Sequence, residues 1–81
     1  MRYFFHVQNG EGRFPDDEGT EFGSPEEART NAVEGIRSIL AEEARKGRMD
    51  FNGRIEVTDA AGRELFRVHY QEAIAIVGTD R

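Results

Sequence analysis

The chain has 81 residues, with 11 Lys or Arg against 16 Asp or Glu, which gives a formal net charge of −5 at pH 7. There is no cysteine, which excludes disulfide bridges and cysteine-ligated zinc, and no apolar run approaches the roughly 20 residues of a membrane span. The length suits a single domain over residues 1–81, and the acidic balance argues against nucleic-acid binding, which relies on clustered Lys and Arg.

The N-terminal residues predict a strand and a tight turn. Residues 2–8 are rich in aromatic and β-branched types, and Asn9-Gly10-Glu11-Gly12 is typical of a hairpin turn. Arg13-Phe14 can begin a short return strand, which Pro15 limits. The first residues hold no apolar stretch typical of a signal peptide, so we expect a cytoplasmic location.

An acidic loop follows, with a brief extended stretch expected at residues 20–22. Its carboxylates surround Gly19 and come from Asp16, Asp17, Glu18 and Glu21. The spacing is not that of a calcium-binding loop, which distributes its ligands over about 12 residues. We expect a solvated loop or a contact for a basic partner, and a weak cation contact remains an alternative.

The clearest local signal predicts one long helix over residues 25–46. Ser24 suits the N-cap, Pro25 the first helical position, and Glu27 can complete a capping box by reaching back to the Ser24 amide. Gly47 is a plausible C-cap. The apolar face is formed by Ala28, Ala32, Gly35, Ile36, Ile39 and Leu40.

Two positions on this helix need comment. Gly35 lies at the edge of the apolar face and is explained either by a close approach of helix and sheet or by a tolerated surface glycine. Glu43 also projects toward the apolar side, and we expect the last turn to overhang the sheet and leave this carboxylate in water.

The C-terminal third predicts a second hairpin. Residues 54–58 alternate strictly, residues 59–62 form a turn that ends in Gly, and residues 63–70 form the partner strand. Residues 71–77 suit either a short helical turn with a tail or a final strand. Together these elements predict an α+β fold of two layers, with one helix packed on a mostly antiparallel sheet of three to four strands in the order β(β)αββ.

Strand parity separates the sheet into two faces. The inner face, toward the helix, is expected to carry Tyr3, Phe5, Val7, Ile55, Val57, Phe66, Val68 and Tyr70. One helix cannot cover both faces, so the outer face stays open. We take it as a candidate partner face with Phe4, His6, Leu65, Arg67 and His69, and an ordinary solvated face is the other interpretation.

Residues with catalytic or metal-binding chemistry are sparse. His6 and His69 with Glu56 would be a poor metal site, and their strands would have to pair. Asn9-Gly10-Glu11-Gly12 is not a phosphate-binding loop. Arg45-Lys46-Gly47-Arg48 is the one basic cluster, and it complements the helix C-terminus. We therefore expect no cofactor and no enzyme activity. A small metal protein or enzyme is the weakest alternative.

The combination of motifs resembles a family of small alphaproteobacterial proteins of unknown function, common in rhizobia. The resemblance covers residues 2–77 and rests on Arg-Tyr-Phe-Phe-His-Val at 2–7, Asp-Asp-Glu-Gly-Thr-Glu-Phe at 16–22, Ser-Pro-Glu-Glu-Ala-Arg at 24–29, and the hairpin segments at 53–59 and 62–65. It implies a bacterial cytosolic protein and carries over no site residues.

A looser likeness over residues 2–45 is to HicB-type antitoxins, which also pass from a strand and hairpin into a helix through a similar cap. That likeness implies an inhibitor that binds a protein. Our leading interpretation is a small interaction or regulatory module that binds a protein partner or a second copy of itself.

Overall fold

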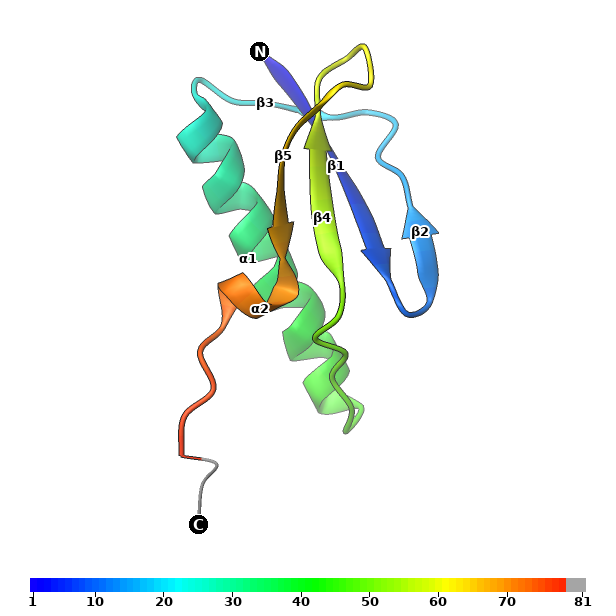
Figure 1. The fold of residues 1–81 in the computed structure, drawn as a ribbon, viewed down its shortest axis with the longest axis vertical. Coiled ribbons are helices and arrows are strands. Elements are labelled where there is room, and N and C mark those ends of the chain that lie inside the picture. The colour runs from blue at the N-terminus through cyan, green and yellow to red at the C-terminus, as the bar shows by residue number, and fades with distance from the viewer. Residues whose placement is uncertain (79–81) are drawn as a thin grey trace.

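The computed structural model describes residues 1–78 and follows the predicted order of elements (Figure 1). The elements are β1 (Arg2–Asn9), β2 (Gly12–Phe14), β3 (Thr20–Glu21), α1 (Pro25–Arg45), β4 (Arg54–Thr58), β5 (Glu64–His69) and α2 (Tyr70–Ala73). The predicted α+β class, with one long helix on an antiparallel sheet, is confirmed.

Helix α1 begins where the capping residues predict. The Ser24 hydroxyl accepts a hydrogen bond from the Glu27 amide at 3.2 Å, and Pro25 occupies the first turn. The Glu27 carboxylate, however, accepts from the amide of Gly23 and not from that of Ser24. The helix ends at Arg45, one residue earlier than expected, and Gly47 takes the left-handed conformation with φ of 87°.

The strands form an antiparallel sheet in the order β2-β1-β4-β5. Strand β3 pairs with β1 at Arg2 and Tyr3, so it lies at the same edge of β1 as β2. The sheet therefore has five strands where three to four were expected. The additional strand is the brief extended stretch predicted near residue 20.

The hydrophobic core lies between α1 and one face of the sheet. The sheet and α2 contribute Tyr3, Ile55, Val57, Val68, Tyr70 and Ala73, and α1 contributes Ala28, Ala32, Ile36 and Leu40. The predicted inner face is confirmed, with Phe5, Val7 and Phe66 partly buried against this core. Gly35 is half-buried, and a Cβ there would lie 3.8 Å from Ile55 Cδ1, so no tight approach requires glycine.

The second hairpin ends in a helical turn and not in a further strand. Strand β5 stops at His69, one residue short of the prediction, because Tyr70 opens α2 and donates its amide hydrogen to the Gly53 carbonyl. Beyond Ala73 the described chain has no regular structure. Of the two interpretations for residues 71–77, the helical turn followed by a tail is confirmed.

Helix α1 does not cover the whole inner face. It packs against β4, β5 and α2, and the β1–β2 hairpin extends beyond it at the other edge of the sheet (Figure 1). Helix α2 is held to α1 by the Arg29–Glu72 ion pair at 2.8 Å and by a hydrogen bond from Arg37 Nε to the Ala73 carbonyl. This off-centre placement leaves part of the inner face open near Phe14.

Candidate functional site

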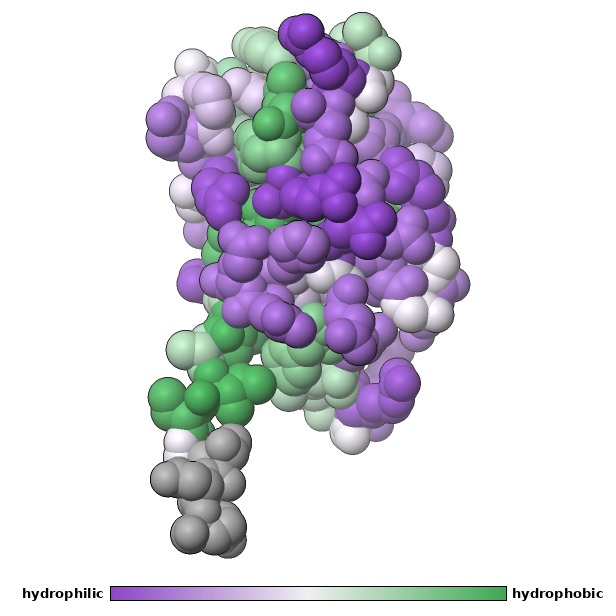
Figure 2. All heavy atoms as spheres, in the orientation of Figure 1, coloured by the Kyte–Doolittle hydropathy of each residue, from purple (hydrophilic) through white to green (hydrophobic). Residues whose placement is uncertain are grey.

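The predicted partner face on the outside of the sheet is largely occupied by its own polar contacts. Figure 2 shows this face as mostly hydrophilic. Phe4 and His6 are half-buried, while Leu65, Arg67 and His69 are exposed. Leu65 is 38% exposed. The five residues therefore share one side of the sheet but do not form a continuous apolar patch.

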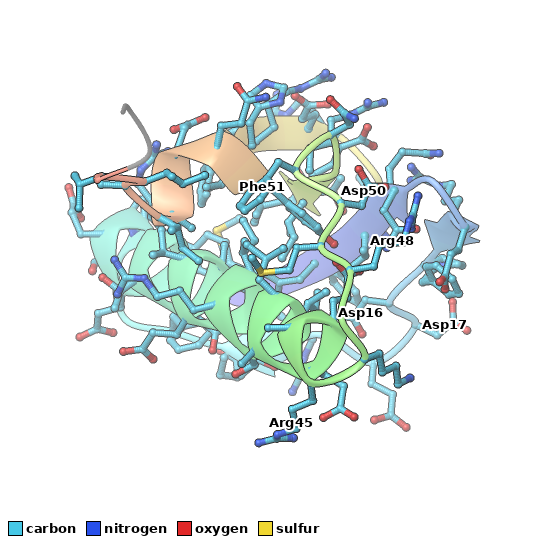
Figure 3. The ribbon with its side chains drawn as sticks, turned by 90° about the horizontal axis from the view of Figure 1, so that it is seen from below. Asp16, Asp17, Arg45, Arg48, Asp50 and Phe51 are labelled. Carbon is cyan, nitrogen blue, oxygen red and sulfur yellow. The ribbon has the colours of Figure 1, made fainter. Side chains whose placement is uncertain are left out.

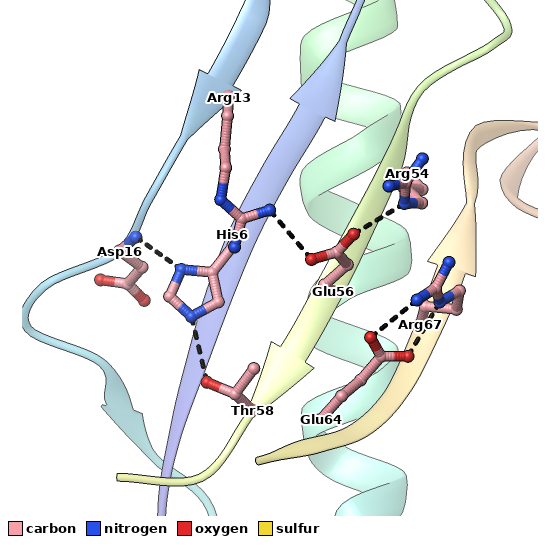
Figure 4. Close-up of polar contacts among 8 residues, drawn as sticks. All are labelled: His6, Arg13, Asp16, Arg54, Glu56, Thr58, Glu64 and Arg67. Carbon is pink, nitrogen blue, oxygen red and sulfur yellow. Dashed lines mark hydrogen bonds and ion pairs between the residues drawn. The ribbon is translucent and has the colours of Figure 1, made fainter. Parts of the chain in front are cut away.

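His6 is fixed by two hydrogen bonds (Figure 4). Its Nδ1 accepts from the backbone amide of Asp16 at 3.1 Å, and its Nε2 lies 3.0 Å from the Thr58 hydroxyl. Because Nδ1 accepts, a neutral ring carries its hydrogen on Nε2 and donates to Thr58. The ring thus ties β1 to β4 and to the acidic loop, and both of its nitrogens are in use.

Charged side chains on β2, β4 and β5 pair with one another (Figure 4). Glu56 accepts from Arg13 at 2.9 Å and from Arg54 at 2.8 Å. These two hydrogen bonds, Arg13 first, hold the pKa of Glu56 below its ordinary value. Arg67 donates twice to Glu64, with both distances at 2.8 Å. The charges are therefore largely satisfied within this face.

The two histidines are not neighbours. Strand β4 lies between β1 and β5, so His6 is opposite Glu56 and His69 is opposite Arg54. Among residues 1–78, no three His, Asp or Glu side chains gather into a group that could hold a metal ion. The strand pairing that the metal hypothesis required is absent from this sheet.

The acidic loop is organised by Asp16. Its carboxylate accepts from the amides of Phe5, Glu18 and Gly19 at 3.0–3.1 Å. Burial raises the pKa of Asp16, but these three hydrogen bonds outweigh it, and the pKa lies below its ordinary value. Asp17 and Glu18 are exposed.

The fourth carboxylate of the loop points elsewhere. Glu21 pairs with the N-terminal ammonium group at 3.2 Å and with Arg2 at 3.5 Å, at the opposite end of the loop from Asp16. The four acidic side chains therefore do not converge on one point. The expected contact of this loop with a basic partner stays a prediction from sequence.

The structure places an apolar concavity elsewhere, between α1 and the β1–β2 hairpin. We call it the hairpin groove. Its volume is about 690 Å³, and its lining is Val7, Asn9, Glu11, Phe14, Ser38, Ile39, Glu42, Glu43, Lys46 and Arg48. Val7 and Phe14 are register partners across the hairpin, and Ile39 faces them from α1. Phe14 is 49% exposed. These three side chains give the groove its apolar surface.

One end of the hairpin groove is crossed by the segment after α1 (Figure 3). The Asp50 amide donates to Glu43 Oε1 at 2.8 Å, and the Asp50 carboxylate accepts from the Gly10 amide at 3.1 Å. Hydrogen bonds from Asn52 and Gly10 lower the pKa of Asp50. The prediction that Glu43 stays in water is wrong, because its carboxylate binds this segment and is half-buried.

Sequence reasoning missed the hairpin groove because it assigned Val7 and Ile39 to the core and Phe14 to a minor return strand. One signal was available. The turn at Asn9–Gly12 fixes the register of the hairpin, so it places Phe14 opposite Val7 on the inner face. Whether α1 covers Val7 and Phe14 depends on the position of the helix across the sheet, and strand parity does not determine that position.

Comparison with known families matches residues 2–71 to a family described as a domain of unknown function (DUF6894). No curated protein and no solved structure matches the chain. The HicB likeness, the bacterial group and the cytoplasmic location therefore stay predictions from sequence. Within residues 1–78, neither helix combines the length and the apolar character that crossing a bilayer requires.

Proposed function

Because the chain belongs to the DUF6894 family, whose function is unknown, its role must be derived from its own surface, and we propose that it is a small protein-interaction module. The proposed binding site is the hairpin groove, and the proposed ligand is an apolar segment of a protein. The observation that carries the proposal is the half-exposed Phe14 aligned with Val7 and Ile39 in one concavity.

The dimensions and chemistry of the groove support this proposal. Its volume lies within the roughly 300–1,000 Å³ typical of binding pockets. The apolar side chains are bordered by both acids and bases, with Glu11 and Glu42 against Lys46 and Arg48. A border of mixed sign does not select a polyanion. It suits a peptide that buries apolar side chains and leaves its polar groups at the edge.

The contacts of His6 also favour a binding role over a catalytic one. Both nitrogens of His6 are engaged within the fold. The hairpin groove itself is lined by no histidine. We therefore propose that the groove recognises a partner without transforming it.

The test is selection of binding peptides from a random displayed library, followed by affinity measurement with labelled peptides. We expect apolar peptides to be enriched. Phe14→Ser should weaken their binding at least about tenfold, as for a central aromatic contact residue. Leu65→Ser is the matched control, because it removes an exposed apolar side chain from the outer sheet face, and it should leave the affinity unchanged.

Two results would refute the proposal. Peptides whose affinity depends on Leu65 and not on Phe14 would place the binding site on the outer sheet face. Failure to enrich any peptide above a scrambled-library background would argue against a peptide-binding role altogether.

A further inference from the structure

We infer that the occupant of the hairpin groove is the apolar C-terminal segment, residues 74–77, of a second copy of this chain. This inference rests on the proposed function, since it uses the same groove. It adds the identity of the partner and the mode of contact.

Residues 74–77 are apolar, and after Ile74, which is partly buried against the core, they leave the body of the protein. Their sequence is Ile-Ala-Ile-Val, and Ile76 and Val77 are 58% and 84% exposed. Figure 1 shows this segment running away from α2, and Figure 2 shows it as the hydrophobic extension below the body. Such side chains favour a site that removes them from water.

The segment begins in an extended conformation, which suits the groove. Ile74 has φ of −141° and ψ of 133°, which is extended backbone. The groove is bordered by β2, which is the last strand in the sheet order at this edge. An extended segment can add beside an edge strand through backbone hydrogen bonds while its side chains enter the adjoining concavity. Ile76 would then lie against Phe14.

The segment cannot reach the groove of its own chain. The hydrogen bond from Arg37 to the Ala73 carbonyl fixes the start of the segment beside the middle of α1. At 100° per residue, Arg37 lies on one flank of the core-facing stripe and Ile39 on the other. The groove, which Ile39 lines, therefore opens on the opposite side of the helix from α2.

The segment is also too short to reach the groove round the end of α1. Four extended residues span at most about 14 Å. The helix axis from Arg37 to its last residue, Arg45, already takes up about 12 Å at 1.5 Å per residue. The apolar side chains end before the chain could pass round the end of α1. A second copy has no such restriction, and reciprocal exchange of two segments closes a two-fold dimer.

The experiment is sedimentation analysis over a range of concentrations. The wild-type chain should reach a mass twice the 9.2 kDa of one chain. The double variant Ile76→Asp/Val77→Asp, which alters only exposed tail positions, should remain monomeric. Phe14→Ser should also remain monomeric, and Leu65→Ser should dimerise as the wild type does. Unchanged circular dichroism spectra and a cooperative thermal transition establish that each variant is folded, and the melting temperature of a monomeric variant is expected to be lower than that of the dimer.

Mixing the two monomeric variants gives the sharpest readout. The tail variant keeps an intact groove and the groove variant keeps an intact tail, so the mixture should form a heterodimer through one tail-to-groove contact. A contact between two grooves or two tails would not be restored by mixing. Formation of a heterodimer in the mixture therefore supports the inference. If the wild type is a dimer and the mixture stays monomeric, the inference is overturned.

The remaining outcomes separate this inference from the proposed function. A wild-type chain that stays monomeric overturns the inference, and so does a dimer that survives the tail changes. In either case, peptide binding that depends on Phe14 would leave the proposed function intact. If Phe14→Ser affects neither peptide binding nor mass, both proposals fail.

Discussion

At the scale of single residues, Tyr70 fills the space that Gly53 leaves in the core. Tyr70 is fully buried, and a Cβ built on Gly53 would lie 2.6 Å from the Tyr70 Cζ atom. The two residues are also joined by the hydrogen bond from the Tyr70 amide to the Gly53 carbonyl. A glycine at position 53 is thus required by packing and not by an unusual backbone angle.

The contact between Gly53 and Tyr70 predicts that a glycine-to-alanine change at position 53 and the same change at position 35 shift the free energy of unfolding in opposite directions. Gly53→Ala should lower the free energy of unfolding by about 1–3 kcal/mol, since the buried Tyr70 ring would have to move. Gly35→Ala should instead raise it by about 0.5–1 kcal/mol, because the added methyl group meets only an ordinary contact and alanine favours a helix. Urea unfolding of both variants measures the two values, and equal effects would contradict the packing argument.

Asp16 gives a prediction for the pH dependence of stability. Its pKa is lower in the folded chain than its ordinary value of 3.8, despite the opposing effect of burial. A lowered folded pKa contributes stability that is present above the unfolded pKa and is lost as the pH falls through the folded pKa. The stability advantage of the wild type over Asp16→Asn should therefore be full at neutral pH and should shrink below about pH 4.

Chemical unfolding at a series of pH values measures this difference. Asp17→Asn is the matched control, because Asp17 is exposed and is the next residue along the same loop. A stability difference between the wild type and Asp16→Asn that is constant from neutral to acid pH would show that the loop does not depend on the ionised carboxylate.

At the scale of elements, local signals in the sequence account for α1 and for both hairpins. The start of α1 depends on one hydroxyl, that of Ser24, which accepts from the Glu27 amide. Ser24→Ala should lower the free energy of unfolding by about 1 kcal/mol. Ser38→Ala is the control within the same helix, where alanine should be neutral or slightly stabilising. Thermal unfolding by circular dichroism distinguishes the two.

Elements that local signals determine could be predicted from the sequence, and elements that depend on distant contacts could not. Caps, turns and alternation are local, so the bounds of α1 and the inner face of the sheet could be predicted closely. The second turn is an example, since Gly62 has φ of 85° where the sequence predicts a turn ending in glycine. The start of α2 at Tyr70 could not be predicted in this way, because it depends on Gly53, which is distant in sequence.

The candidate site depends even more on distant contacts. The outer face was predicted as a partner face that no helix covers, and its charges satisfy one another in pairs such as Arg13–Glu56, which strand parity alone does not reveal. The hairpin groove arises because α1 lies over β4 and β5. No local pattern encodes that lateral position. In that position α1 contacts α2 through Arg29 and Arg37.

At the scale of the whole molecule, a single long helix packs on a sheet that is wider than the helix. It covers the half of the sheet beside α2, and the β1–β2 hairpin extends beyond it (Figure 1). The exposed residues 75–77 and the hairpin groove are therefore on opposite sides of α1. A monomer arranged in this way has an unfilled apolar concavity and an uncovered apolar segment at once. The two proposals above, peptide capture and reciprocal exchange, both follow from this arrangement.

The segment that joins α1 to β4 has a consequence for how such a protein can diverge. Its Asp50 links the end of the helix, through Glu43, to the tip of the hairpin, through Gly10, without contributing to the core cluster. Insertions and substitutions are tolerated best in surface connections. Changes at residues 46–50 can therefore alter the opening of the groove while Phe51 and Gly53, which pack against the core cluster and Tyr70, keep their places, so one scaffold can acquire new binding preferences at little cost in stability.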